Sequence, residues 1–161
     1  MDYTLYDKDR LIISDLFYTP DTGDIVVVQD TKESMFRGPI IKRVIATAGE
    51  TVDIDFDTWT VTVTDKEGNV TTLDEPYVNR VDGTMSNPSG SLVYPHAVTY
   101  PHTVAEGCVF VMGDNRNNSL DSRYVGDIDE RMILGKAYIR IFPGRKTSND
   151  GLDFSRIGFV K

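Results

Sequence analysis

One stretch of the chain concentrates side chains that can do chemistry. Residues 112–123 follow a short apolar run and carry six charged or hydroxyl-bearing side chains: Asp114, Arg116, Ser119, Asp121, Ser122 and Arg123. The two arginines can form bidentate ion pairs with the two aspartates, and Asp and Asn side chains can fix turns through hydrogen bonds to the backbone. Composition alone fits a rigid connecting loop as well as a functional site, because loops often but not always carry function.

Lys42 is the most suggestive single residue outside that stretch. The run Ile40–Ala46 predicts a strand, in which Lys42 would share one face with Val44 and other apolar side chains. Loss of hydration on such a face lowers the pKa of a lysine from about 10.4, and a neutral amine can act as a general base. The alternative, which the isolated residue favours, is a lysine at a strand end whose ammonium group extends into water.

A lysine base requires a nucleophile, and the serines supply no motif of their own. Ser34, Ser119 and Ser122 all lack a Gly-x-Ser-x-Gly pattern. A Ser–His–Asp triad would need His96 or His102, which occur in two Tyr-Pro-His copies. Proline-bounded histidines in loops are expected to be exposed, so we do not favour a triad.

The sequence predicts no metal site and no cofactor. A single cysteine, Cys108, excludes an internal disulfide and a multi-cysteine zinc site, and its apolar neighbours predict a buried core residue. Neither histidine has a carboxylate at helical spacing. Two aspartate-containing runs fail the calcium-loop pattern, because Thr58 stands where one needs glycine and Arg116 where the other needs a ligand.

Length and charge bound the class of protein. The 161 residues fit one domain, with or without an insertion, and are long enough to bury a core. A net charge of -8 argues against non-specific binding to nucleic acid or anionic lipid. The sequence has no run of about 18 apolar residues and no signal-peptide pattern at its start.

Short strands are the elements expected to position these residues. β-Branched or alternating runs predict strands at 11–13, 24–29, 40–46, 51–56, 59–64, 69–73, 109–112 and 134–142. Asp65–Gly68 predicts a hairpin turn, and Asp82–Thr103 predicts a long surface excursion. Convincing helical patterns are absent. We therefore predict an all-β fold, either a barrel or paired sheets.

The stretch 113–123, Gly-Asp-Asn-Arg-Asn-Asn-Ser-Leu-Asp-Ser-Arg, resembles the signature box of the type I signal peptidases. These are membrane-bound Ser–Lys proteases that remove secretory signal peptides. Segments similar to further boxes follow the family's order: 23–27, 41–45 with 49–50, 75–77, Gly126, and 135–137 with Pro143. The resemblance implies a catalytic β core from 1–50 and 105–143, an inserted smaller β region at 51–104 and a C-terminal tail at 144–161.

The resemblance also implies roles for individual residues. Lys42 matches the family's general base, and Ser119 matches a serine whose hydroxyl orients that lysine. The loop's other charged side chains are expected to support the site: Asp114, Arg116, Asp121 and Arg123, the last two as an ion pair. Such support would hold a base within hydrogen-bonding reach.

One family position has no match within this chain. The family's nucleophilic serine begins the pattern Ser-Met-x-Pro-Thr-Leu, and Met1–Leu5 fits the rest of it with Tyr3 in place of proline. We therefore expect the nucleophile directly before Met1, after a hydrophobic anchor, and we expect this chain by itself to be inactive. Ser34 is too close in sequence to Lys42 to be that nucleophile. The residues expected to contact substrate are Met1, Asp2 and Tyr3.

The implied chemistry is acyl transfer by a Ser–Lys dyad. A serine hydroxyl would attack the peptide carbonyl while neutral Lys42 takes its proton and later protonates the leaving amine. The implied substrates are secretory preproteins with small residues at the first and third positions before the cut, bound as an extended strand. The full-length protein is expected in the cell membrane with its catalytic part outside the cytoplasm, and this fragment is expected to be soluble.

Two other classes stay open on the sequence. A pseudo-peptidase would keep the peptide groove without a serine, and Tyr3 in place of proline gives that alternative some support. A cytoplasmic Ser–Lys self-cleaving repressor relative would share the β fold but would need an upstream DNA-binding segment. The acidic charge and the complete signature box count against the repressor relative.

Overall fold

The computed structural model describes residues 1, 4–30, 38–78 and 98–160, and within them the fold is all-β, as predicted. The larger of two antiparallel sheets has seven strands in the order β1-β10-β2-β3-β8-β9, with β11 also paired to β10. Its strands are β1 (Arg10–Ser14), β2 (Ile25–Val28), β3 (Ile40–Thr47), β8 (Cys108–Met112), β9 (Ile128–Asp129), β10 (Ile133–Phe142) and β11 (Gly158–Phe159).

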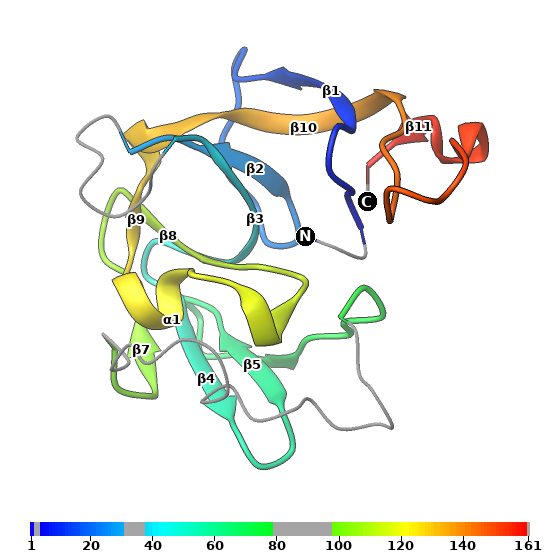
Figure 1. Cartoon of the computed structure of the whole chain (residues 1–161). Helices are drawn as coiled ribbons and strands as arrows, with labels where there is room; N and C mark the ends of the chain where they lie inside the picture. The colour runs from blue at the N-terminus through cyan, green and yellow to red at the C-terminus, as the bar shows by residue number, and fades with distance from the viewer. Residues whose placement is uncertain (2–3, 31–37, 79–97, 161) are drawn as a thin grey trace.

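The smaller sheet has four strands in the order β6-β5-β4-β7. Its strands are β4 (Thr51–Asp55), β5 (Thr60–Thr64), β6 (Val70–Thr72) and β7 (His102–Thr103). Alternation in β4 buries Val52 and Ile54 and leaves Asp53 and Asp55 exposed. Figure 1 shows this sheet beneath the larger one, with the short helix α1 (Ser122–Val125) at the level where the two meet.

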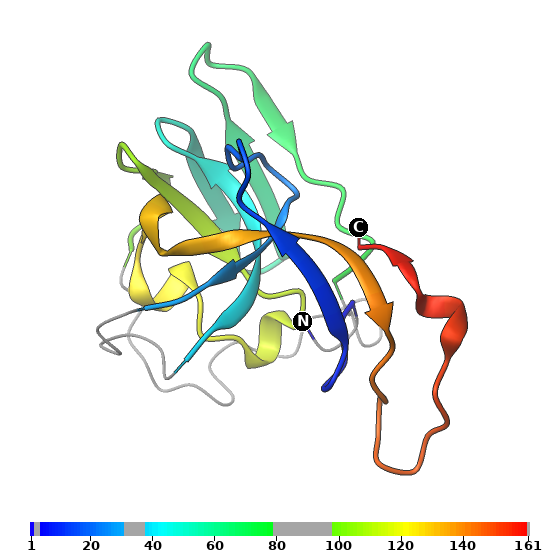
Figure 2. The same ribbon diagram turned by 90° about the horizontal axis from the view of Figure 1, so that it is seen from above.

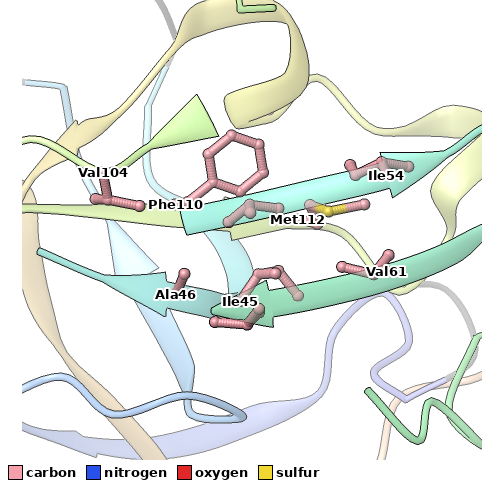
Figure 3. Close-up of a cluster of buried hydrophobic side chains, with 9 residues drawn as sticks. Ile45, Ala46, Ile54, Val61, Val104, Phe110 and Met112 are labelled. Carbon is pink, nitrogen blue, oxygen red and sulfur yellow. The ribbon is translucent and has the colours of Figure 1, made fainter. Parts of the chain in front are cut away.

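Apolar side chains of β3 and β8 join the two sheets. Figure 3 shows this cluster, which contains Ile45 and Ala46 of β3, Phe110 and Met112 of β8, and residues of β4 and β5. A second buried cluster takes other side chains of the same strands: Val44, Val109 and Val111, with Val26, Val28 and Ile128. Burial on both faces explains why β3 and β8 are apolar over most of their length.

The eight predicted strands are all present, and their ends differ from the prediction by one residue at most. The missed elements are α1, β7, β9, β11 and the 3-10 turns η2 (Arg116–Asn118), η3 (Glu130–Met132) and η4 (Phe154–Arg156). Each has two to four residues, which is too short to show a hydrophobic period. The division into core, insertion and tail stays a prediction.

Three further predictions concern Cys108, the excursion at 82–103 and the absence of a membrane-spanning run. Cys108 is only partly buried, because it begins β8 rather than lying within it. Most of the predicted excursion Asp82–Thr103 lies outside the described residues, and its described end contains β7. In the part of the chain that the structure describes, no helix has the length and apolar character to cross a bilayer.

Candidate active site

Strand β3 and the loop after β8 bring Lys42 and Ser119 to the same glycine. Lys42 is 8% exposed, and Gly113 directly follows β8. A Cβ atom built on Gly113 would lie 3.7 Å from Lys42 Nζ and 2.3 Å from Ser119 Oγ. The lysine nitrogen and the serine hydroxyl therefore lie against one point. The alternative of a lysine extending into water is wrong, because Lys42 is buried within its strand.

The Ser119 hydroxyl is buried at this point. Ser119 is 4% exposed, and its Oγ forms no hydrogen bond to the described residues. It lies close enough to Asp121 to help lower the pKa of that carboxyl, but its geometry falls short of a hydrogen bond. A buried hydroxyl without a hydrogen-bond partner costs free energy. Its burial here therefore favours a functional interaction between the Ser119 hydroxyl and a neighbouring group. That Ser119 orients Lys42 stays a prediction.

Asp121 and Arg123 form the expected ion pair, and both are completely buried. Arg123 Nε lies 2.8 Å from Asp121 Oδ1, and the Gly113 N–H donates to Asp121 Oδ2 at 3.0 Å. Burial acts to raise the pKa of Asp121, but the charge and hydrogen bonds of Arg123 and the Gly113 N–H outweigh it and lower that pKa. Asp121 also caps α1. The carboxylate thus ties the beginning of the loop to its end.

Asp114 pairs with Arg43, not with an arginine of its own loop. Arg43 donates to both carboxylate oxygens of Asp114 at 3.0 Å and to the Gly23 carbonyl at 2.8 Å. The side chains of Arg43 and Asp114 are buried. The expectation that both aspartates of 112–123 pair with arginines of that stretch is therefore wrong for Asp114. Sequence reasoning missed Arg43, although a second charged residue directly after Lys42 in an apolar strand was a visible signal.

Arg116 pairs with Glu75 from the segment that leads out of the smaller sheet. Both side chains are buried, and Arg116 donates to the two Glu75 carboxylate oxygens and to the Gly113 carbonyl. Tyr77 donates to Glu75 at 3.2 Å, and its ring lies 3.7 Å from the Arg43 guanidinium. Glu75 and Tyr77 lie in segment 75–77, which is similar to a family box, and the resemblance implies no role for either residue. They connect the two arginine pairs on one side of the loop.

The first residues of the chain contact the same loop. Thr4 Oγ1 donates a hydrogen bond to Asp114, and the Met1 carbonyl accepts from the Thr4 and Leu5 N–H groups at 3.0 and 2.8 Å. Leu5 is buried, and Met1 packs against its cluster. Asp2 and Tyr3, two of the expected substrate contacts, lie outside the described residues. The Met1 end is nevertheless fixed to the loop that carries Ser119.

The other sequence candidates have different surroundings. The Ser122 hydroxyl accepts a hydrogen bond from the Val111 N–H at 2.9 Å, which anchors α1 to β8. His102 is partly buried rather than exposed, and its Nε2 lies 2.7 Å from Asp127 Oδ1. Ser34 and His96 lie outside the described residues. Among the described residues, no three His, Cys, Asp or Glu side chains are grouped so that they could hold a metal ion.

The chain is similar to proteins of one family. A family model described as "Signal peptidase, peptidase S26" matches residues 1–142. "Probable signal peptidase I-2" of Synechocystis is 35% identical over 150 residues, which cover 89% of this chain and 59% of that protein. "Signal peptidase IB" of Staphylococcus aureus is 31% identical over 154 residues, with 89% and 73% covered. This chain thus spans about three fifths of the first relative's length.

A solved structure supports the same likeness. The crystal structure of a signal peptidase I from Enterococcus faecalis V583 is 28% identical to this chain, with a TM-score of 0.53. The superposition covers 74% of this chain and 97% of that one.

Proposed function

Because the chain belongs to the signal peptidase family S26, we propose that it is the catalytic part of a type I signal peptidase, a serine endopeptidase that removes signal peptides from secretory preproteins. One observation carries the proposal: Lys42 is buried, and its Nζ faces the Gly113 position that the Ser119 hydroxyl also faces. Removing an amine from water disfavours its charged form. A general base needs the neutral form.

In the proposed reaction, a serine hydroxyl gives its proton to the Lys42 amine as its oxygen bonds to the carbonyl carbon before the cut. The tetrahedral intermediate collapses, the C–N bond breaks, and Lys42 returns the proton to the leaving amine. Water then attacks the ester with Lys42 again as base, which releases the acyl group and restores the serine. Main-chain and hydroxyl donors stabilise the oxyanion.

The attacking serine is the one that the resemblance expects directly before Met1. Support comes from the Thr4 hydroxyl, which ties the segment after that position to Asp114 on the loop that carries Ser119. In this arrangement Ser119 donates or accepts a hydrogen bond that aims the Lys42 amine at the nucleophile. The family pattern implies these two different roles, with one serine as the nucleophile and Ser119 as the residue that orients Lys42.

The three buried ion pairs act as rigid supports for the dyad. Two of them fasten the loop to other elements, through Arg43 on β3 and Glu75 after β6. Buried pairs contribute little net stability, because desolvation of the charges offsets their attraction. They nevertheless fix the geometry of the loop, because separating the partners would leave a buried charge without compensation. We assign Asp114, Arg116, Asp121 and Arg123 to holding the loop in one conformation.

The proposed substrate is an extended peptide with small residues at the first and third positions before the cut. Met1, Asp2 and Tyr3 are proposed to contact it beside the nucleophile, where backbone pairing along a strand edge gives affinity and shallow pockets give specificity. The proposed location of the full-length protein is the cell membrane, with this part outside the cytoplasm. The proposed partners are secretory preproteins.

The test uses the chain extended by one serine before Met1 and a synthetic signal peptide with Ala-x-Ala before the cut. Extended chains with serine or alanine at the added position are compared, each with and without Lys42→Met. Cleavage is expected only when serine and Lys42 are both present. Removal of the base should lower the cleavage rate by about 10²–10⁴-fold. Lys146→Met, at an exposed position in the tail, is the control.

Two results would contradict the proposal. Equal cleavage by the Lys42→Met and parent chains would remove the proposed base. Cleavage that survives alanine at the added position but disappears in Ser34→Ala would move the nucleophile elsewhere. Specific peptide binding without cleavage, with serine and Lys42 both in place, would favour the pseudo-peptidase.

A further inference from the structure

We propose that the C-terminal tail, residues 144–160, holds the N-terminal segment, residues 4–9, in position at the active site, with Arg156 as the positioning residue. The proposal rests on the proposed function, because it assigns the N-terminal segment to the nucleophile. The tail lies beyond residues 1–142, which the family model matches. Its contacts are therefore a property of this chain that the family likeness does not supply.

Asp9 is the centre of these contacts. Its side chain is 3% exposed and accepts hydrogen bonds from Arg140 Nη1 at 3.0 Å and Arg156 Nη2 at 3.1 Å. The Gly144 N–H donates to the other carboxylate oxygen at 2.5 Å. One carboxylate of the N-terminal segment thus joins the end of β10, the first residue of the tail and the η4 turn. A buried carboxylate with two arginines fixes all three elements geometrically.

Arg156 also binds the backbone of the N-terminal segment. Its Nη2 donates to the Thr4 carbonyl at 3.3 Å, and its guanidinium lies 3.7 Å from the centre of the Tyr6 ring. Arg140 donates to the same Thr4 carbonyl at 3.0 Å and to the Arg156 carbonyl at 2.6 Å. Arg156 therefore contacts three different residues of segment 4–9, and Arg140 holds Arg156 itself.

The close packing of the tail against this segment is visible at both ends. A Cβ atom on Gly144 would lie 1.9 Å from the Asp7 carbonyl oxygen, so the tail begins in direct contact with the N-terminal segment. At its other end β11 pairs with β10, and Val160 packs in one cluster with Met1 and Leu5. Figure 2 shows the C-terminal segment turning back toward β10.

A short path connects Arg156 to the proposed base. Arg156 holds the Thr4 carbonyl, the Thr4 hydroxyl donates to Asp114, and Asp114 pairs with Arg43. Arg43 is the residue after Lys42 in β3. Loss of Arg156 should let residues 4–9 move relative to this loop. A displacement of about 1 Å between reacting groups can cost about 100-fold in rate.

The test compares Arg156→Ala, Arg156→Lys and a control in the whole chain extended by serine. The control is Arg131→Ala, because Arg131 forms an exposed ion pair with Asp129. Amide hydrogen exchange over residues 4–9 is measured first, since it does not depend on catalysis. Steady-state cleavage of the synthetic signal peptide and the melting temperature follow.

We expect Arg156→Ala to exchange at residues 4–9 about tenfold faster or more than the parent chain. Its kcat should fall about 10- to 100-fold while KM stays within about twofold. Arg156→Lys keeps the charge but not the planar fork that spans Asp9 and Thr4, so it should retain an intermediate kcat. Arg131→Ala should match the parent chain in all three measurements.

Unchanged protection of residues 4–9 in Arg156→Ala would overturn the proposal. A lower melting temperature with unaltered kcat per folded molecule would overturn it too, because the tail would then only stabilise the fold. A serine-extended parent that cleaves no peptide contradicts the proposed function instead. In that case, faster exchange at residues 4–9 in Arg156→Ala would still support the proposal that the tail restrains the N-terminal segment.

Discussion

Gly113 and Ser119 lie so close together that only a residue without a side chain fits at position 113. A Cβ atom there would lie 2.3 Å from Ser119 Oγ and 2.7 Å from Ser119 Cβ, far inside van der Waals contact. Lys42 Nζ lies 3.7 Å from the same point. A side chain at position 113 would therefore displace Ser119 from its place beside this point. Close approach is the role of Gly113, since its backbone is not in the left-handed region.

The first prediction concerns Gly113→Ala in the serine-extended chain. The added methyl group must push Ser119 away, and the clash with Ser119 Cβ requires movement of the backbone. We expect kcat/KM for the synthetic signal peptide to fall about 100-fold. Gly151→Ala is the matched control, because Gly151 has open space around its Cβ position and no positive φ. Full activity in folded Gly113→Ala would show that Ser119 does not need this position.

The second prediction contrasts the two buried serines of the loop. Ser119→Ala should lower kcat about 10- to 100-fold with little change in melting temperature, because Ser119 Oγ forms no hydrogen bond to the described residues. Ser122→Ala should do the reverse, because it leaves the buried Val111 N–H without its acceptor. That loss costs about 1–3 kcal/mol of unfolding free energy. Equal effects of both changes on kcat would contradict separate roles.

The third prediction concerns the buried pair of Asp121 and Arg123. Arg123→Met leaves the Asp121 carboxylate buried without its charged partner, so the free energy of unfolding should fall by about 3–5 kcal/mol. Urea denaturation followed by tyrosine and tryptophan fluorescence measures the loss. Arg131→Met, which breaks an exposed pair, should cost less than about 1 kcal/mol. Similar losses in the two variants would argue against the importance of burial.

The sequence predicted the strands well because alternation and β-branched runs report burial locally. Val52 and Ile54 of β4 are an example, since their polar neighbours are exposed. The proximity of Lys42 and Ser119, 77 positions apart, came from the family likeness and not from periodicity. No local pattern reports a contact between residues so distant in the chain.

The ion-pair partners could not be predicted because sheet register decides them. Arg43 lies opposite Met112 in the β3–β8 ladder, so the residue two places further, Asp114, comes within its reach. Register is a tertiary property, whereas the loop sequence by itself favours ion pairs among residues 112–123. Glu75 was hidden for the same reason, since its approach to Arg116 depends on how the smaller sheet packs on the larger one.

The last prediction is a loss of stability in acid that Asp9 helps to cause. Burial acts to raise the pKa of Asp9, but the Gly144 and Tyr6 N–H groups and the two arginines outweigh it and lower that pKa below 3.8. A carboxyl with a lowered pKa in the folded state stabilises the fold above its ordinary pKa, and this contribution disappears as the pH falls through the lowered value. Asp9→Asn should therefore melt below the parent chain at pH 7.

The difference between Asp9→Asn and the parent chain should narrow as the pH falls below about 4, where the unfolded parent begins to protonate Asp9, and should narrow further until the folded parent is protonated too. Melting temperatures measured from pH 7 to pH 2 give this comparison directly. Asp7→Asn, at an exposed aspartate two residues earlier, should show a small difference at every pH. Asp121 also has a lowered pKa, so Asp9→Asn should itself still lose stability in acid, but with a shallower slope than the parent chain. A gap between Asp9→Asn and the parent that stays constant down to pH 2 would mean that the Asp9 charge does not hold the tail against the N-terminal segment.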